Sequence, residues 1–333
     1  MKKSKILLSA IAITLAIFVI FFFNQCSEKE SELTKITFRL DWVPGAEHSF
    51  LYAAQSKGYF KDEGLEVTIQ AGDGSTTAAK LVGNGTVDYA LCSGDTALMA
   101  FSKGTPVKVL AVLYNQPPTV IYSRKDRNIV SPKDLEGKKY GAYVKSTTYK
   151  QFIAFCETNE LDLSKVEVVP TAGKAQDILT DAVDASGGYA YIQPVQCEIE
   201  GVPVNEIYIS DYGVNPYSMS IITNKNKQNP EVTRSVVEVA LKAFQEMAEN
   251  PAESLDIYLK GNPTANKAFE EKKILKLSQF LKKIWGPKMD VGQQTMDGWA
   301  KTQEFLISQQ LMDAEVQLAD FFTIEFLPVK NHK

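Results

Sequence analysis

Asp41 and Trp42 are the neighbouring residues best suited to hold a small flat ligand. The segment 36–40 is typical of a strand, and Pro44 ends it because proline cannot donate to the hydrogen-bond ladder of a sheet. The pair therefore follows the carboxyl end of a strand, where open α/β sheets bind ligands. An indole can stack on a heteroaromatic ring, and a carboxylate can accept hydrogen bonds from a ring amino group. The alternatives are a core tryptophan and an aspartate that only caps the following turn.

Ser93, Gly94 and Asp95 form a second candidate element, where another apolar run gives way to a helical pattern. Gly94 allows the backbone to approach a ligand closely, and free amides at a helix start bind anionic or carbonyl oxygens. Asp95 is equally an ordinary helix N-cap. His48 either contacts the ligand or caps the helix that follows it.

Tyr143, Lys145, Ser146 and Thr147 form a third element, again between a strand and a helix. Hydroxyls and unpaired amides suit a phosphate, formyl or carboxyl group, to which Lys145 would add positive charge. The spacing is not that of a P-loop. A solvated, capped loop is the alternative.

Tyr189, Tyr191 and Gln193 form the fourth element, directly after the glycine pair 187–188. The glycines let the chain approach a cleft, and either tyrosine would form the wall opposite Trp42 in an aromatic sandwich. The amide of Gln193 can both donate and accept hydrogen bonds.

The elements that position these groups alternate between strand and helix from residue 35 onward. This alternation predicts a mostly parallel sheet with helices on both faces. The predicted strands are 36–40, 65–70, 89–92, 107–114, 139–143, 166–169, 185–189, 205–209 and 218–223. The predicted helices are 50–56, 76–82, 95–103, 148–159 and 175–181, followed beyond residue 229 by an all-helical region with helices at about 266–284, 292–309 and 316–321.

Asn229 and Asn250 each precede a proline and, soon after, an acid, a pattern typical of helix starts. Six apolar residues after Asn229 recur at steps of three and four, which predicts one buried helix face. They are Val232, Val236, Val239, Ala240, Ala243 and Met247.

Two α/β sets joined by two crossings, near 122–125 and 223–225, predict two lobes around a cleft. We expect lobe 1 to comprise residues 35–123 plus 224–333, with the carboxy-terminal helices as its extension, and lobe 2 to comprise 124–223. Two connecting strands make a hinge, because few residues need to absorb a rotation.

The amino terminus has the pattern of an export leader. Three lysines precede an uncharged apolar run over 6–23, which predicts a secretory signal within residues 1–25. Cys26 and the polar linker 26–34 resemble a bacterial lipoprotein site, although Gln25 stands where a small residue is usual. An uncleaved membrane anchor is the alternative. Either way, we expect the folded part to be exported to the periplasm or cell surface and tethered to the membrane.

Charge and composition exclude several function classes. Loss of residues 1–25 removes three lysines and no acids, so the net charge changes from −4 to −7. The chain has no basic cluster, which argues against nucleic-acid binding. Two histidines and four cysteines at unrelated spacings give no support to a zinc site or a disulfide framework, although a single Cys156–Cys197 bridge is possible. We expect no metal and no cofactor.

The opening residues carry a resemblance to a known family. Leu-Asp-Trp-Val-Pro over 40–44, His48, Lys-Gly-Tyr-Phe over 57–60 and Gly-Leu over 64–65 resemble solute-binding proteins of ABC importers. The branch that captures pyrimidine precursors of thiamine looks most similar, over about residues 35–259. The departures are Gly45, where the family usually has Asn, and Gln193, where that branch tends to have Glu.

The resemblance implies a two-lobed α/β fold of the type II periplasmic-binding class and a non-enzymatic role. We expect a monomer that captures an aminopyrimidine and delivers it to a permease and its ATPase. Riboflavin, nitrate and alkanesulfonates are the alternative ligands. A thiamine-pyrimidine synthase is the enzymatic alternative, but the iron-binding cysteine run of that enzyme corresponds here to 193–197, which has one cysteine, Cys197.

Overall fold

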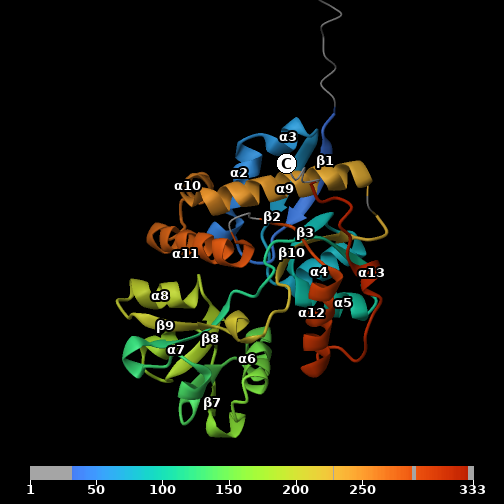
Figure 1. The fold of residues 1–333 in the computed structure, drawn as a ribbon. Coiled ribbons are helices and arrows are strands. Elements are labelled where there is room, and N and C mark those ends of the chain that lie inside the picture. The colour runs from blue at the N-terminus through green and yellow to red at the C-terminus, as the bar shows by residue number, and fades with distance from the viewer. Residues whose placement is uncertain (1–31, 228, 287–289, 329–333) are drawn as a thin grey trace, which may run out of the picture. The chain divides into compact units, whose positions relative to one another are not determined.

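The computed structural model describes residues 32–227, 229–286 and 290–328 (Figure 1). The predicted leader 1–25, the lipidation site Cys26 and most of the linker 26–34 lie outside these residues. Within the described ranges, no helix is both long and apolar enough to cross a membrane.

The first of two five-stranded sheets has the strand order β2-β1-β3-β10-β4. Strand β1 runs parallel to β3, whereas β10 runs antiparallel to both of its neighbours, β3 and β4. The bounds are β1 Thr34–Arg39, β2 Leu65–Gln70, β3 Tyr89–Ser93, β4 Val107–Val112 and β10 Met219–Asn224.

The second sheet has the order β7-β6-β8-β5-β9. Strand β6 is parallel to β7 and β8, and β5 is antiparallel to β8 and β9. The bounds are β5 Thr119–Arg124, β6 Lys139–Ala142, β7 Glu167–Pro170, β8 Ala185–Tyr189 and β9 Val204–Tyr208.

Each sheet contains one strand that runs antiparallel to its neighbours, β10 in the first and β5 in the second, so both sheets are mixed. Each of these strands enters its sheet from the other one and therefore runs against its neighbours. Strand β5 was not predicted, because its run Thr-Val-Ile-Tyr-Ser is buried throughout and lacks the alternation of a half-buried strand. Strand pairing gives β5 to the second sheet and β10 to the first. We therefore propose crossings near residues 115–118 and 213–218, a few residues before those expected from the sequence.

Helices cover the sheets and form the carboxy-terminal region (Figure 1). Two of them, α3 and α8, were not predicted. Before residue 200 the helices are α2 Ser49–Ser56, α3 Tyr59–Asp62, α4 Ser75–Asn84, α5 Gly94–Ser102, α6 Thr147–Thr158, α7 Gln176–Leu179 and α8 Gln193–Ile199. The carboxy-terminal helices are α9 Pro230–Glu249, α10 Pro251–Gly261, α11 Lys267–Trp285, α12 Met296–Ser308 and α13 Leu318–Phe321.

The start of α9 is capped as the sequence predicts. The Asn229 side chain accepts hydrogen bonds from the backbone amides of Glu231 and Val232. Asn250 occupies the N-cap position of α10, but its side chain makes no capping hydrogen bond. Five of the six predicted face residues of α9 are buried, and Val232 is partly buried.

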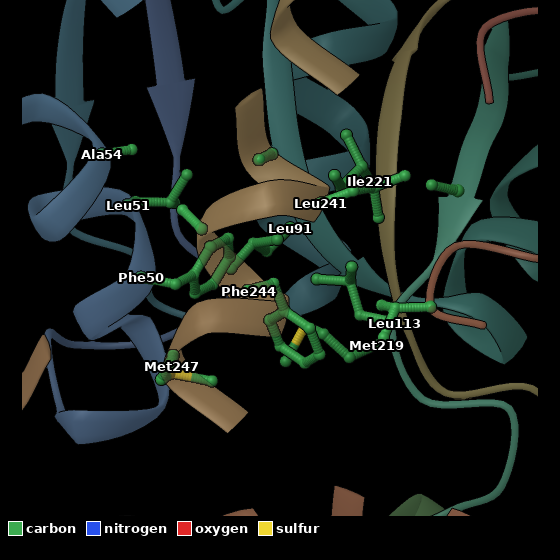
Figure 2. Close-up of a cluster of buried hydrophobic side chains, with 14 of the residues drawn as sticks. Phe50, Leu51, Ala54, Leu91, Leu113, Met219, Ile221, Leu241, Phe244 and Met247 are labelled. Carbon is green, nitrogen blue, oxygen red and sulfur yellow. The ribbon is translucent and has the colours of Figure 1, made fainter. Parts of the chain in front are cut away.

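The main hydrophobic core lies between α2, α9 and the first sheet (Figure 2). Phe50 of α2 meets Phe244 of α9 edge to face at 5.1 Å. On the other side of this sheet, Trp299 of α12 is fully buried and packs edge to face against Tyr217 and Phe321. These contacts bring the carboxy-terminal helices onto the first sheet, as predicted for an extension of lobe 1.

Helix α11 also contacts the second sheet. Lys276 pairs with Glu206 of β9 at 2.6 Å, and Phe280 stacks on Tyr208 with ring centroids 6.4 Å apart. Helix α11 also packs in the main core, next to the first sheet. This one helix therefore contacts both α/β halves of the fold.

Cys92, Cys156 and Cys197 are free, buried thiols. Cys156 and Cys197 lie in separate hydrophobic clusters, so the structure lacks the Cys156–Cys197 bridge that the sequence left possible.

Candidate functional site

A cleft of about 480 Å³ is lined by residues from both sheets. Its walls follow the carboxyl ends of the parallel strands β1, β3, β6 and β8, together with the amino-terminal ends of the antiparallel strands β5 and β10. These ends meet because the crossings place both sheets with the same edge toward the cleft. This is the edge at which open α/β sheets bind ligands.

Trp42 lines the cleft with an accessible side chain, 54% exposed. Two backbone hydrogen bonds hold its loop against the chain that leaves β2. The Gly72 amide donates to the Trp42 carbonyl at 2.9 Å, and the Gly74 amide donates to the Asp41 carbonyl at 2.7 Å. The backbone of Trp42 is therefore fixed, while its indole does not pack in the hydrophobic core.

Asp41 also lines the cleft, and His48 supports it from behind. His48 Nε2 lies 2.9 Å from Asp41 Oδ1, and His48 Nδ1 accepts a hydrogen bond from the Gly45 amide at 3.2 Å. That pair of contacts fits a neutral ring with its proton on Nε2. His48 is buried and does not line the cleft, so the structure places it next to Asp41 and not on the cleft wall.

Burial lowers the pKa of His48, but the carboxylates of Glu47 and Asp41 raise it by more, so the net shift is upward. Protonation of Nδ1 would break the hydrogen bond from Gly45. Both the neutral ring and the protonated ring carry the Nε2 proton that Asp41 accepts, so only the contact with Gly45 is lost on protonation.

The start of α5 contributes Ser93, Asp95 and Thr96 to the cleft. Asp95 is buried and accepts hydrogen bonds from the amide and the hydroxyl of Thr96. Burial raises its pKa, and the hydrogen bonds from Ser93 and Thr96 offset part of that rise. Ser93, not Asp95, occupies the N-cap position.

Gly94 faces away from the cleft, contrary to the expectation of a close approach to ligand. A Cβ at this position would press on the Trp299 ring at 2.9 Å and on the backbone carbonyls of Tyr217 and Ser218. The glycine is therefore needed for packing α5 against β10 and α12.

On the opposite wall, the start of α6 contributes Tyr143, Ser146 and Thr147. The Ser146 hydroxyl accepts from the Tyr149 amide at 3.1 Å and so caps the helix, while Tyr143 is half exposed. Lys145 is exposed and is not among the cleft-lining residues.

Tyr189, Tyr191 and Gln193 all line the cleft from the second sheet and α8. Tyr191 is buried and backs Tyr189, with ring centroids 6.0 Å apart. Burial raises the pKa of both phenols, so both rings are neutral at physiological pH. The Gln193 oxygen accepts from the Tyr189 amide at 2.8 Å, which fixes the strand end that carries the tyrosine.

Several cleft residues were missed by the sequence analysis. Ser75 and Thr76 begin α4, Thr119 begins β5, and its hydroxyl donates to Gln151 at 2.6 Å. The Gly-Ser step at 74–75 after a strand was an available signal. No sequence pattern pointed to Glu47, because a single acidic residue in a turn is common.

All charged side chains among the described residues that line the cleft are acidic. Asp41, Glu47 and Asp95 are its acids, and among the described residues that line it there is no lysine, arginine or histidine. Such a wall repels anions and favours ligands that donate hydrogen bonds or carry positive charge.

Residues 45–254 match the family described as NMT1/THI5 like. Among curated relatives, the chain is 26% identical to the riboflavin-binding protein RibY of Chloroflexus aurantiacus, over 89% of this chain and 87% of that protein. It is 28% identical to the formylaminopyrimidine-binding protein of Halalkalibacterium halodurans, over 90% and 92%.

The chain is also 28% identical to 4-amino-5-hydroxymethyl-2-methylpyrimidine phosphate synthase THI11 of Saccharomyces cerevisiae, over 70% of this chain and 72% of that protein. Among solved structures, the periplasmic aliphatic sulphonate binding protein SsuA of Escherichia coli superposes with a TM-score of 0.69 at 12% identity, over 87% of this chain and 91% of that one. At that identity the likeness concerns the fold, which is the two-lobed α/β periplasmic-binding fold.

Proposed function

The chain belongs to the NMT1/THI5-like family, and from this membership we propose that it captures an aminopyrimidine of the thiamine-precursor type for an ABC importer. The observation that carries the proposal is the pairing of an exposed indole, Trp42, with a cleft wall whose charged groups are all acids. A flat ring offers a face to the indole, and its amino group offers hydrogens to the carboxylates.

Stacking on Trp42 would supply part of the affinity, on the order of 1–3 kcal/mol by analogy with bases on aromatic side chains. Tyr189, backed by Tyr191, stands on the other wall as the second aromatic surface. Ligand that touches both walls stabilises the closed arrangement of the lobes by its differential affinity for it.

Asp41 is the carboxylate that we propose for the ring amino group, since His48 fixes one of its oxygens at 2.9 Å. The helix starts at Ser75 and Thr147 offer amides to a carbonyl or formyl oxygen of the same ligand. We propose that Ser93, Asp95, Ser146, Thr147 and Gln193 complete the polar lining.

The acidic wall argues against nitrate and alkanesulfonates, two of the alternative ligands. An anion would lie near Asp41 and Asp95, no described residue that lines the cleft is a cation, and the Lys273 ammonium behind the wall is already paired with Glu47. Lys145, the basic residue expected from the sequence, does not line the cleft.

Riboflavin is the second candidate, favoured by the relative RibY. Its isoalloxazine ring would use the same stacking surface, and pockets of 300–1,000 Å³ hold ligands of its size. It lacks the exocyclic amino group that we assign to Asp41, so substitution of Asp41 separates the two ligands.

We propose a binding protein and not a synthase. Cys197, the single cysteine in the run 193–197, is fully buried in a hydrophobic cluster, and burial raises its thiol pKa to about 11. His48 is likewise committed to Asp41 and Gly45 behind the wall. We further propose that the chain is an exported monomer, tethered through a lipid on Cys26 or through its leader, that serves a permease and its ATPase.

Calorimetric titration with a ligand panel tests the proposal. We expect 4-amino-5-hydroxymethyl-2-methylpyrimidine or its formylamino relative to bind with a micromolar or lower Kd, and methanesulfonate and nitrate not to bind. If riboflavin is the only compound of the panel that binds, riboflavin replaces the aminopyrimidine as the proposed ligand. Binding of methanesulfonate without any ring compound would refute the proposal.

A further inference from the structure

Glu47 lies on the cleft wall and is nearly inaccessible to solvent, with 7% of its surface exposed. Its carboxylate pairs with the ammonium of Lys273, which comes from α11 and is equally buried. Burial raises the pKa of Glu47, but the net shift is downward, chiefly because of the Lys273 ammonium, so the carboxylate is ionised. A buried ionised group on a ligand cleft requires an explanation, because desolvation makes it costly.

The cluster around this pair is assembled by α11. Glu270, one turn before Lys273, accepts the backbone amide of Ala46 at 2.7 Å, and its carboxylate lies 3.7 Å from the Lys273 ammonium. Both residues of α11 therefore hold the turn 45–48, which follows Asp41 and Trp42 directly. Lys273 and Glu270 lie beyond residue 254, where the family match ends.

Gly45 is part of the same arrangement. A Cβ at this position would overlap a Glu47 carboxylate oxygen and would lie 2.6 Å from the Lys273 ammonium. A glycine at 45 thus leaves the space that the ion pair occupies against the backbone. This gives a physical reason for the departure from asparagine noted at this position in the sequence.

The ion pair leaves Glu47 with unused capacity. A carboxylate has about four lone-pair sites, and the contact with one ammonium does not fill them. Hydrogen bonds to an ionised acceptor are about twice as strong as neutral ones. A ligand N–H at this wall would therefore find a strong, rigidly placed acceptor.

We infer that Glu47 is a specificity-determining residue that selects ligands with N–H donors, and that Lys273 is the positioning residue that holds its carboxylate on the cleft wall. This inference deepens the proposed function and depends on it, because it specifies which part of the ring compound this wall recognises. It assigns the role to a carboxylate held from α11, a helix outside the strand ends that form the rest of the site.

The test compares two ligands that differ in one group, 4-amino-5-hydroxymethyl-2-methylpyrimidine and its counterpart with hydrogen in place of the 4-amino group, titrated into the purified full chain. The measured quantity is the ratio of the two Kd values. We expect Glu47→Gln to lower the preference for the amino compound at least tenfold, chiefly by weakening its binding. Lys273→Met should weaken binding of the amino compound, and Lys273→Arg should restore much of it.

The double variant E47Q/K273M guards against misfolding, since it replaces the pair by two neutral side chains of similar size. We expect it to retain a Tm close to that of the unmodified chain and to show the same loss of preference as E47Q. Gly45→Ala should shift the preference in the unmodified chain and have little effect on it in the double variant, where the pair is absent.

An unchanged ratio in both E47Q and the double variant would overturn the inference while leaving the proposed function intact. An equal loss of affinity for both ligands, or failure of the double variant to fold, would also overturn it, because the pair would then have only a structural role. If the unmodified chain binds neither pyrimidine, the proposed function itself fails, and this inference fails with it.

Discussion

Replacement of Trp42 by alanine should weaken ligand binding without weakening the fold. The indole is 54% exposed, and its loop is held by backbone hydrogen bonds at Gly72 and Gly74, so its removal leaves no core cavity. We expect the Tm to change by no more than a few degrees. The effect of the substitution should appear in binding alone.

The magnitude follows from the stacking surface. Loss of an aromatic face under a base-like ring costs about 1–3 kcal/mol. At about 1.4 kcal/mol per factor of ten, this raises the Kd roughly 5- to 150-fold. Trp42→Phe should recover part of the loss because a smaller face remains.

Calorimetry with an aminopyrimidine measures the affinity, and tryptophan fluorescence reports on the contact. Trp299 is fully buried, and the Trp285 indole donates to the Leu113 carbonyl at 2.8 Å, so Trp42 is the indole on the cleft wall. Ligand should change the emission of the unmodified chain and not that of Trp42→Ala. Val43→Ala is the matched control, since Val43 is the exposed neighbour and does not line the cleft. An affinity within twofold of the unmodified chain in Trp42→Ala would refute the stacking role.

Three further outcomes are expected. Trp299→Ala should lower the free energy of unfolding by about 3–5 kcal/mol, because it empties a fully buried site; a loss below 1 kcal/mol by chemical denaturation would contradict the packing described. The raised pKa of Asp95 favours the folded state when the group is protonated, and this contribution is lost as the pH rises through the folded pKa. Asp95→Asn should therefore gain stability relative to the unmodified chain between pH 4 and pH 7 in thermal unfolding, and a relative loss over that range would count against the buried carboxylate. Fatty acid labelling of the expressed chain should disappear in Cys26→Ser, and labelling that persists would exclude lipidation at that residue.

Strand ends were the part of the site most accessible from the sequence. Asp41 and Trp42 directly follow a strand stopped by a proline, and the serine and threonine at 146–147 precede a helix with the pattern of a cap. These signals are local, since a few neighbouring residues determine where a strand or helix begins. The chemistry of the strand ends on both walls could therefore be anticipated before the pairing of the strands was known.

Contacts between residues far apart in the chain could not be predicted from the sequence, because no local pattern signals them. Lys273 lies 226 positions after Glu47, and nothing near either residue signals that they pair. The orientation of Gly94 depends on Trp299, which belongs to a distant helix. Strand β5 escaped prediction because the tertiary fold buries both of its faces. In each case the deciding neighbour comes from a segment far along the chain.

The structure of the chain with a bound aminopyrimidine is the most direct measurement of the central claim. The account predicts the ring in the cleft, one face on the Trp42 indole and the other toward the wall that carries Tyr189, with its amino group at a carboxylate. A ring bound outside this cleft, or inside it with Trp42 still open to solvent, would contradict the account.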